Sequence, residues 1–159
     1  MIMVKLLIDN IGGNMKIGIA NDHHGVELNK DLTKYLKGLG YDVVNYGPDT
    51  TDPVDYPIYA FKLGEAVACK DVDFGIVICS SGIGVSIACN KVKGVRCAKV
   101  NDEWEAKMTR LDNDSNVIAI SSRFPLEFLE KLIKIFIETD FSHEERHQRR
   151  VDLINNYNG

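Results

Sequence analysis

Short apolar runs alternate with amphipathic segments along most of the chain. The apolar runs predict five strands, over residues 16–20, 41–47, 73–79, 94–100 and 115–121. The segments between them have apolar residues at helical spacing and predict helices over 26–39, 57–68, 84–91, 103–111 and 125–138. Strands that alternate with helices at this spacing are typical of βαβ units. We therefore expect a Rossmann-like three-layer α/β/α fold with a five-stranded parallel sheet.

The two ends of the chain differ from this alternating pattern. A last, charged helix is predicted over 142–157, and Ser142 and Glu145 have the spacing of a capping box at its start. At the other end, a Gly-Gly-Asn turn signal precedes a second methionine, Met15. We interpret residues 1–14 as an N-terminal extension and residues 15–159 as one domain.

The predicted topology selects a small number of loops as candidates for a ligand site. Ligands of open parallel sheets bind beyond the carboxyl ends of the strands. The loops expected at that edge are NDHHG at 21–25, GPDTTDPVDYP at 47–57, CSSGIG at 79–84, NDE at 101–103 and SSR at 121–123. Functional residues are expected on these loops.

Composition narrows the class of protein. The chain has 159 residues, 45% hydrophobic content and a formal net charge of -4, which favours one globular domain and disfavours general attraction to nucleic acid or membrane surfaces. Its four cysteines lack CxxC spacing, so neither a zinc site nor a disulfide framework is indicated. With no recognisable leader and no apolar stretch near the roughly 20 residues of a membrane span, we expect a cytoplasmic protein with reduced thiols.

Cys79 lies where the third predicted strand meets the following helix, in the stretch VICSSGIGVSIACNK. A helix N-terminus has free N–H groups and a dipole that favour negative charge, so this position favours a thiolate. Such a thiolate can act as a base or a nucleophile. The alternative is a small buried apolar residue, which is what we expect of Cys69, Cys89 and Cys97.

The residues that follow Cys79 form a glycine-containing loop, with serines at 80 and 81 and glycines at 82 and 84. Backbone N–H groups of such a loop can stabilise a developing anion, although glycines at strand-to-helix turns also serve steric needs alone. Two rival chemistries are excluded by residue type. A tyrosine-phosphatase loop needs an arginine where Val85 stands, and a P-loop needs a Gly-Lys-Ser/Thr sequence that is missing.

Two further groups could contact an anionic substrate. Asp22 and His23 follow the first strand, where an Asp-His pair can orient an imidazole for proton transfer or phosphate contact; a surface or capping role is the alternative. The RHQRR stretch places Arg146 and Arg150 on one helical face, suited to a phosphate dianion. A solvated face balanced by neighbouring glutamates is the alternative for that cluster.

Taken together, these motifs resemble the ribose-5-phosphate isomerase B type family, which includes galactose-6-phosphate and allose-6-phosphate isomerases. The matching segments are NDHHG, VDYP, GIVICSSGIGVSIACNKVKGVR, NDSNVIAISSR and RHQRRVDLI, in the family's order. The resemblance implies aldose–ketose isomerisation of a sugar phosphate through an enediolate, most directly ribose 5-phosphate to ribulose 5-phosphate. It implies no metal and no cofactor, and a homodimer or tetramer in which the last helix reaches a partner's active site.

The resemblance also implies roles for individual residues. Cys79 aligns with the base that forms the enediolate, Ser81 with a hydroxyl group that positions the substrate, and Asp112 with the residue that opens the sugar ring. The positions that the resemblance places at the substrate or its phosphate are Asp22, His23, Asp55, Tyr56, Ser80, Gly82, Gly84, Asn113, Arg123, Arg146, His147 and Arg150.

Two departures from the family pattern bear on the substrate. The family has histidine where this chain has Asp112, and glycine and threonine where it has Ser80 and Ser81. Asp112 could act as a carboxylate base. The change could also indicate another substrate, such as an allose, galactose or tetrose phosphate.

Two non-enzymatic interpretations remain open at the level of sequence. One is a regulatory module that binds sugar phosphates with little or no turnover. The other is a phosphorylatable receiver domain, which needs an aspartate after the third strand and a lysine after the fifth. Cys79 and Ser121 stand at those places and disfavour the receiver domain.

Overall fold

The computed structural model describes residues 14–158, so residues 1–13 of the proposed extension lie outside the described residues. Five parallel strands form one sheet in the order β2-β1-β3-β5-β4. The strands are β1 (Lys16–Asn21), β2 (Asp42–Asn45), β3 (Phe74–Cys79), β4 (Cys97–Lys99) and β5 (Val117–Ser121). Because all pairs are parallel, the carboxyl ends of the five strands meet at one edge of the sheet. This confirms the predicted sheet.

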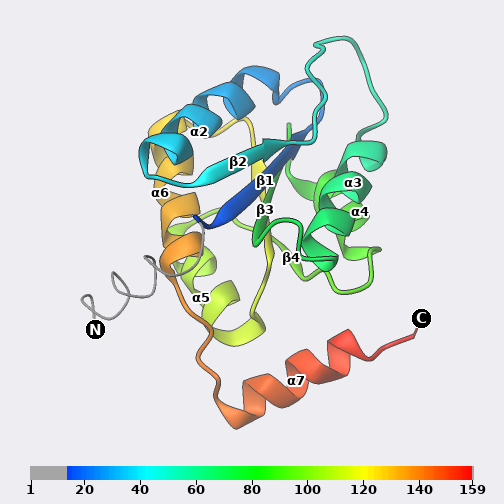
Figure 1. Cartoon of the computed structure of the whole chain (residues 1–159), viewed down its shortest axis with the longest axis vertical. Helices are drawn as coiled ribbons and strands as arrows, with labels where there is room; N and C mark the ends of the chain where they lie inside the picture. The colour runs from blue at the N-terminus through cyan, green and yellow to red at the C-terminus, as the bar shows by residue number, and fades with distance from the viewer. Residues whose placement is uncertain (1–13, 159) are drawn as a thin grey trace.

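Helices cover both faces of the sheet (Figure 1). One face is covered by α2 (Val26–Gly38), α5 (Glu103–Asn113) and α6 (Leu126–Glu138), and the other by α3 (Tyr56–Ala68) and α4 (Ile83–Asn90). The strand side chains alternate between the two layers, as the pleat requires. On β3, Ile76 and Ile78 pack in the α2/α5/α6 layer, whereas Val77 and Cys79 pack in the α3/α4 layer.

The last helix, α7 (Glu145–Asn155), lies outside these layers at the lower end of the molecule in Figure 1 and packs against α5. The predicted capping box is wrong, because Glu144 is the N-cap and α7 begins at Glu145. Tertiary contacts explain why the helix starts later than predicted. The Ser142 N–H group donates to the carbonyl oxygen of Leu111, and His143 has a φ of 57°, which holds this stretch outside the helix.

Two of the cysteines also differ from the expectation of burial. Cys69 is exposed at the end of α3, where its thiol donates to Asp71 Oδ2 across 3.1 Å. Cys97 is half-buried, and a hydrogen bond with Cys89 together with burial raises the pKa of the Cys97 thiol well above its usual range. All four cysteines are free thiols. Among the described residues, no helix has the length and apolar character needed to cross a membrane.

Candidate active site

Cys79 ends β3 at the carboxyl edge of the sheet, with its residue 5% exposed. The chain then turns back through Gly82, whose φ of +74° glycine adopts without steric cost, and α4 begins at the next residue. This turn directs the N–H group of Gly82 at Cys79 Sγ, with 3.0 Å between nitrogen and sulfur. A hydrogen bond to the sulfur stabilises a thiolate more than a neutral thiol. The fold therefore supplies a donor for a sulfur anion.

The two serines of this loop have different surroundings. Ser81 Oγ lies 3.9 Å from Cys79 Sγ and accepts a hydrogen bond from the N–H group of Ile83 at 3.1 Å. The carbonyl oxygen of Ser80 accepts from Ser121 Oγ at 2.6 Å, which fastens the loop to the end of β5. The Ser81 hydroxyl is thus held beside the sulfur, whereas Ser80 is exposed.

Gly84 makes room for an aromatic side chain. A Cβ atom at Gly84 would lie 2.6 Å from both Cζ and Oη of Tyr56, so the tyrosine ring lies directly against the first turn of α4. Tyr56 is the first residue of α3 and follows Asp55, the exposed N-cap of that helix. Pro57 lies in the first turn of α3. Backbone N–H groups there have no acceptor within the helix, so the missing N–H group of proline costs no hydrogen bond. Tyr56 and the cysteine loop are therefore neighbours.

Asp22 and two histidines follow β1 at the same edge. The Asp22 N–H group donates to the carbonyl oxygen of Ile78, which places Asp22 beside the end of β3. Its buried carboxylate accepts from the His24 N–H group at 2.9 Å and lies 3.1 Å from His24 Nδ1. His23 Nδ1 accepts from the N–H group of Val54 at 3.3 Å, so a neutral His23 ring carries its hydrogen on Nε2.

Within residues 14–158, Asp22, His23 and His24 form the one group of side chains that could hold a metal ion. One ligand atom from each of Asp22, His23 and His24 lies within 4.8 Å of the others. The hydrogen bonds just described already engage several of these nitrogen and oxygen atoms. The sequence analysis paired Asp22 with His23, whereas the histidine that contacts the Asp22 carboxylate is the next residue, His24.

Arg123 completes this group at the carboxyl edge. It follows β5, its N–H group donates to Ser121 Oγ at 3.2 Å, and its side chain is exposed. The structure thus brings most of the predicted site residues to one edge, on the loops that follow β1, β3 and β5 and at the start of α3. These residues are Asp22, His23, Asp55, Tyr56, Cys79, Ser80, Ser81, Gly82, Gly84 and Arg123.

The remaining predicted residues lie at the opposite edge within one chain. Asp112 and Asn113 end α5, which begins beyond the carboxyl end of β4 and returns toward the amino end. The carbonyl oxygen of Asn113 accepts from Nε of Arg96, the residue just before β4, at 3.2 Å. Arg146, His147 and Arg150 are on α7. One chain therefore does not bring Cys79 and the basic residues of α7 together.

A pair of arginines that the sequence analysis missed fixes the end of α5. The Arg96 guanidinium donates to the carbonyl oxygen of Asp114 at 2.8 Å and to Asn155 Oδ1 of α7 at 2.7 Å. Burial lowers the pKa of Arg96, and the carboxylate of Asp114 opposes that shift. Arg110 donates to Asp114 Oδ1 at 2.8 Å. The i,i+4 spacing of Arg110 and Asp114 is a signal for the contact between those two, whereas no spacing predicts the contacts of Arg96.

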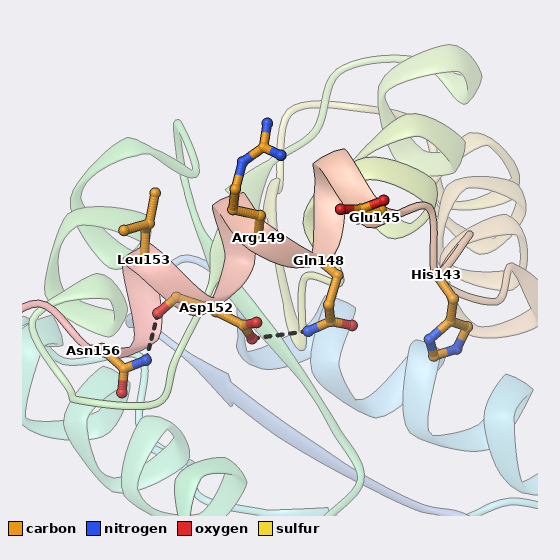
Figure 2. A pocket seen from close by; sticks show the side chains of 7 residues that line it. All are labelled: His143, Glu145, Gln148, Arg149, Asp152, Leu153 and Asn156. Atoms are coloured by element: carbon orange, nitrogen blue, oxygen red, sulfur yellow. Dashed lines mark hydrogen bonds between the residues drawn. The ribbon is translucent and has the colours of Figure 1, made fainter.

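Two surface pockets lie along α7, and Cys79 lines neither of them. One of about 570 Å³ follows the face of α7 that includes Gln148, Arg149 and Leu153 (Figure 2). The other, of about 960 Å³, lies between the end of α7 and the segment from Asn90 to Val95. Arg149 thus belongs to a different face from His147, which is buried against α5.

Comparison with known proteins gives a consistent result over nearly the whole chain. The Ribose/Galactose Isomerase family matches residues 17–154. Ribose-5-phosphate isomerase B of Escherichia coli is 36% identical over 140 residues, which cover 87% of this chain and 93% of that protein.

Solved structures agree with this result. The type B ribose 5-phosphate isomerase of Trypanosoma brucei has a TM-score of 0.87 and 37% identity, covering 90% of this chain and 98% of that one. Ribose-5-phosphate isomerase B of Mycoplasma genitalium, solved with bound ribulose-5-phosphate, has a TM-score of 0.86 and 39% identity, covering 92% and 97%. The chain therefore belongs to the ribose/galactose isomerase family.

Proposed function

We propose that the protein interconverts an aldose phosphate and its ketose isomer through an enediolate, with ribose 5-phosphate and ribulose 5-phosphate as the pair. The observation that carries this proposal is the sulfur of Cys79 at the carboxyl edge, with the Gly82 N–H group 3.0 Å away. The family membership and the ribulose-5-phosphate bound to the Mycoplasma genitalium relative support the substrate.

Cys79 is proposed as the base. Its thiolate takes the proton from C2 of the open-chain aldose, the C2–H electron pair forms the C1–C2 double bond, and the C1 carbonyl oxygen becomes an enediolate oxygen. The proton of the C2 hydroxyl group passes to the C1 oxygen, and the thiol returns its proton to C1 as the C2 oxygen becomes the ketone oxygen. Ser81, held 3.9 Å from the sulfur, is placed to donate to an enediolate oxygen. The Tyr56 hydroxyl and the Asp55 carboxylate are available to the hydroxyl groups of the sugar.

The phosphate requires cations, and Arg123 is the cationic side chain among the predicted residues at the carboxyl edge. Arg146, His147 and Arg150 are the further cationic or protonatable groups proposed for the phosphate. Because they lie at the other edge of the same chain, we infer that two copies assemble so that α7 of one reaches the Cys79 loop of the other. Binding energy from the remote phosphate then positions C1 and C2.

Exposed apolar residues beside the cysteine loop support such an assembly. Ile83 and Ile87 are one turn apart on α4 and are 52% and 62% exposed, and Phe61 on α3 is 39% exposed. Apolar groups that gather beside a functional loop are typical of a surface covered by a partner. The four free cysteines suit a reducing compartment, and we place the reaction in the cytoplasm.

The test is an isomerisation assay of the purified protein with pentose, hexose and tetrose phosphates, aldose and ketose monitored separately. We expect the highest kcat/KM with ribose 5-phosphate. A higher value with a hexose or tetrose phosphate would reassign the substrate. Tight binding of sugar phosphates without turnover of any of them would contradict the enzyme and indicate a regulatory module.

A further inference from the structure

Asp112, at the end of α5, contacts a side chain of α7. Its Oδ1 atom lies 3.3 Å from His147 Nε2, so the carboxylate and the imidazole are within ion-pair distance of each other. The His147 side chain is 9% exposed, and that of Asp112 is 35% exposed. The contact therefore joins the last turn of α5 to the first turns of α7 in a half-buried setting.

A chain of contacts continues from this pair to an arginine of α7. Glu144 Oε2 lies 3.9 Å from the same His147 Nε2 atom and accepts from Arg146 Nε at 3.0 Å. Asp112 and Glu144 thus flank the imidazole nitrogen, and Glu144 also restrains the guanidinium group of Arg146. A displacement of the His147 ring would therefore also shift the guanidinium group of Arg146, through Glu144.

Few other contacts hold this end of α7. Within α7, all of whose residues are described, His147 and Val151 are the two buried residues. The far end has a separate attachment, because Arg96 donates to Asn155 Oδ1 at 2.7 Å. The half of α7 with Arg146 and Arg150 therefore depends on His147 and Val151, because a helix that buries few side chains gains little stability from packing.

We propose that Asp112 is a positioning residue that acts through His147: its carboxylate fixes the imidazole at the root of α7 and so sets where Arg146 and Arg150 meet a phosphate group. The phosphate role of α7 rests on the proposed function. Because Asp112 Oδ1 faces His147 Nε2 at 3.3 Å, we assign Asp112 to positioning rather than to proton transfer in ring opening.

Affinity for inorganic phosphate, measured by calorimetry, tests this proposal without turnover. Truncation in Asp112→Ala is expected to weaken phosphate binding about ten-fold, the scale on which the loss of one polar contact with His147 acts. Asp112→Asn keeps an oxygen that can accept from His147 Nε2 and is expected to stay within about two-fold of the wild type. Glu145→Gln controls for the change in charge near α7 and is expected to change nothing.

A double-mutant cycle shows whether Asp112 acts through His147. Phosphate affinity of Asp112→Ala with His147→Ala is expected to match that of His147→Ala alone, because the second change removes a contact that is already lost. Additive losses would overturn the proposal, and so would an unchanged affinity in Asp112→Ala or an equal loss in Asp112→Asn. Asp112→Ser removes the same contact and serves where the alanine variant does not fold.

Turnover separates this proposal from its main rival. Ribose 5-phosphate closes into a ring, whereas erythrose 4-phosphate cannot, because the hydroxyl group that would close its ring is phosphorylated. A positioning role predicts that Asp112→Ala raises KM for both substrates by a similar factor. Loss of kcat with ribose 5-phosphate alone, in both Asp112→Ala and Asp112→Asn, would assign ring opening to Asp112 instead. Absence of all turnover in the wild type would refute the isomerase and leave the phosphate measurements valid.

Discussion

The N–H group of Gly82 points at the sulfur of Cys79, with 3.0 Å between the two atoms. This contact exists because Gly82 adopts a left-handed conformation immediately before α4, which returns the backbone over the end of β3. A donor fixed by the backbone costs no reorganisation when the thiol becomes an anion. The turn therefore places a backbone donor where the proposed Cys79 thiolate needs one.

Replacement of Gly82 tests the role of the hydrogen bond from its N–H group to the Cys79 sulfur. Gly82→Ala places a Cβ atom 3.1 Å from the carbonyl carbon of Ile120, in a conformation that costs an L-residue about 1–2 kcal/mol. We expect lower thermal stability, and a fall in kcat of up to about ten-fold because the strained loop shifts and moves the backbone N–H donor away from the sulfur. Gly38→Ala is the matched control, since nothing lies within 4 Å of a Cβ atom there. Equal kcat values for the two variants would count against a role of the Gly82 N–H group in catalysis.

The contact between Gly84 and Tyr56 predicts a second effect on substrate binding. A Cβ atom at Gly84 would lie 2.6 Å from the tyrosine hydroxyl oxygen, so Gly84→Ala displaces the ring rather than the helix. KM is expected to rise about five-fold, the scale of one hydrogen bond to the sugar. In a Tyr56→Ala background, Gly84→Ala should have no further effect on KM. Additive changes in KM would show that the glycine acts independently of the ring.

Sites shared between two copies predict that inactive variants complement each other. Cys79→Ala and the double variant Arg146→Ala/Arg150→Ala damage different halves of the proposed site. Refolding the two together is expected to restore about a quarter of the wild-type activity, since half of the random dimers have one intact site of two. Each variant refolded alone should stay inactive. No recovery in the mixture would contradict the shared site.

A stability prediction concerns the buried guanidinium group of Arg110. It donates to Asp114 and lies 4.8 Å from the ring centre of Phe74 and 5.7 Å from that of Phe136. Arg110→Ala leaves Asp114 without this partner and opens space beside two aromatic rings. Urea denaturation is expected to show a loss of about 3–5 kcal/mol in the free energy of unfolding. Arg149→Ala, on the exposed face of α7, should change it by less than about 0.5 kcal/mol.

Much of the fold could be predicted from the sequence because its pattern is local. The apolar run of β3 and the helical spacing of α2 and α6 are signals within one segment, and the five strands and three layers follow from them. The parallel topology then gathers the residues after β1, β3 and β5 at one edge without further information. These are the residues for which the sequence analysis and the geometry agree.

Other features depend on contacts that no local pattern contains. The start of α7 is set by a hydrogen bond between Ser142 and Leu111, which overrides the capping-box spacing. The contacts of Arg96 with Asp114 and with Asn155 of α7 join segments that are separate along the chain. The contact between Asp112 and His147 likewise joins two separate helices, α5 and α7, so no local pattern predicts it. This contact changes the role proposed for Asp112.

The central claim is that the Cys79 thiolate moves the proton between C1 and C2. Its most direct test is the turnover of ribose 5-phosphate by Cys79→Ala, measured beside the affinity of the same variant for inorganic phosphate. We predict that kcat falls by about 10²–10⁴-fold, the usual contribution of a positioned base, while phosphate affinity stays within about two-fold of the wild type. Turnover at the wild-type rate in a variant that binds phosphate normally would contradict the assignment of Cys79 as the base.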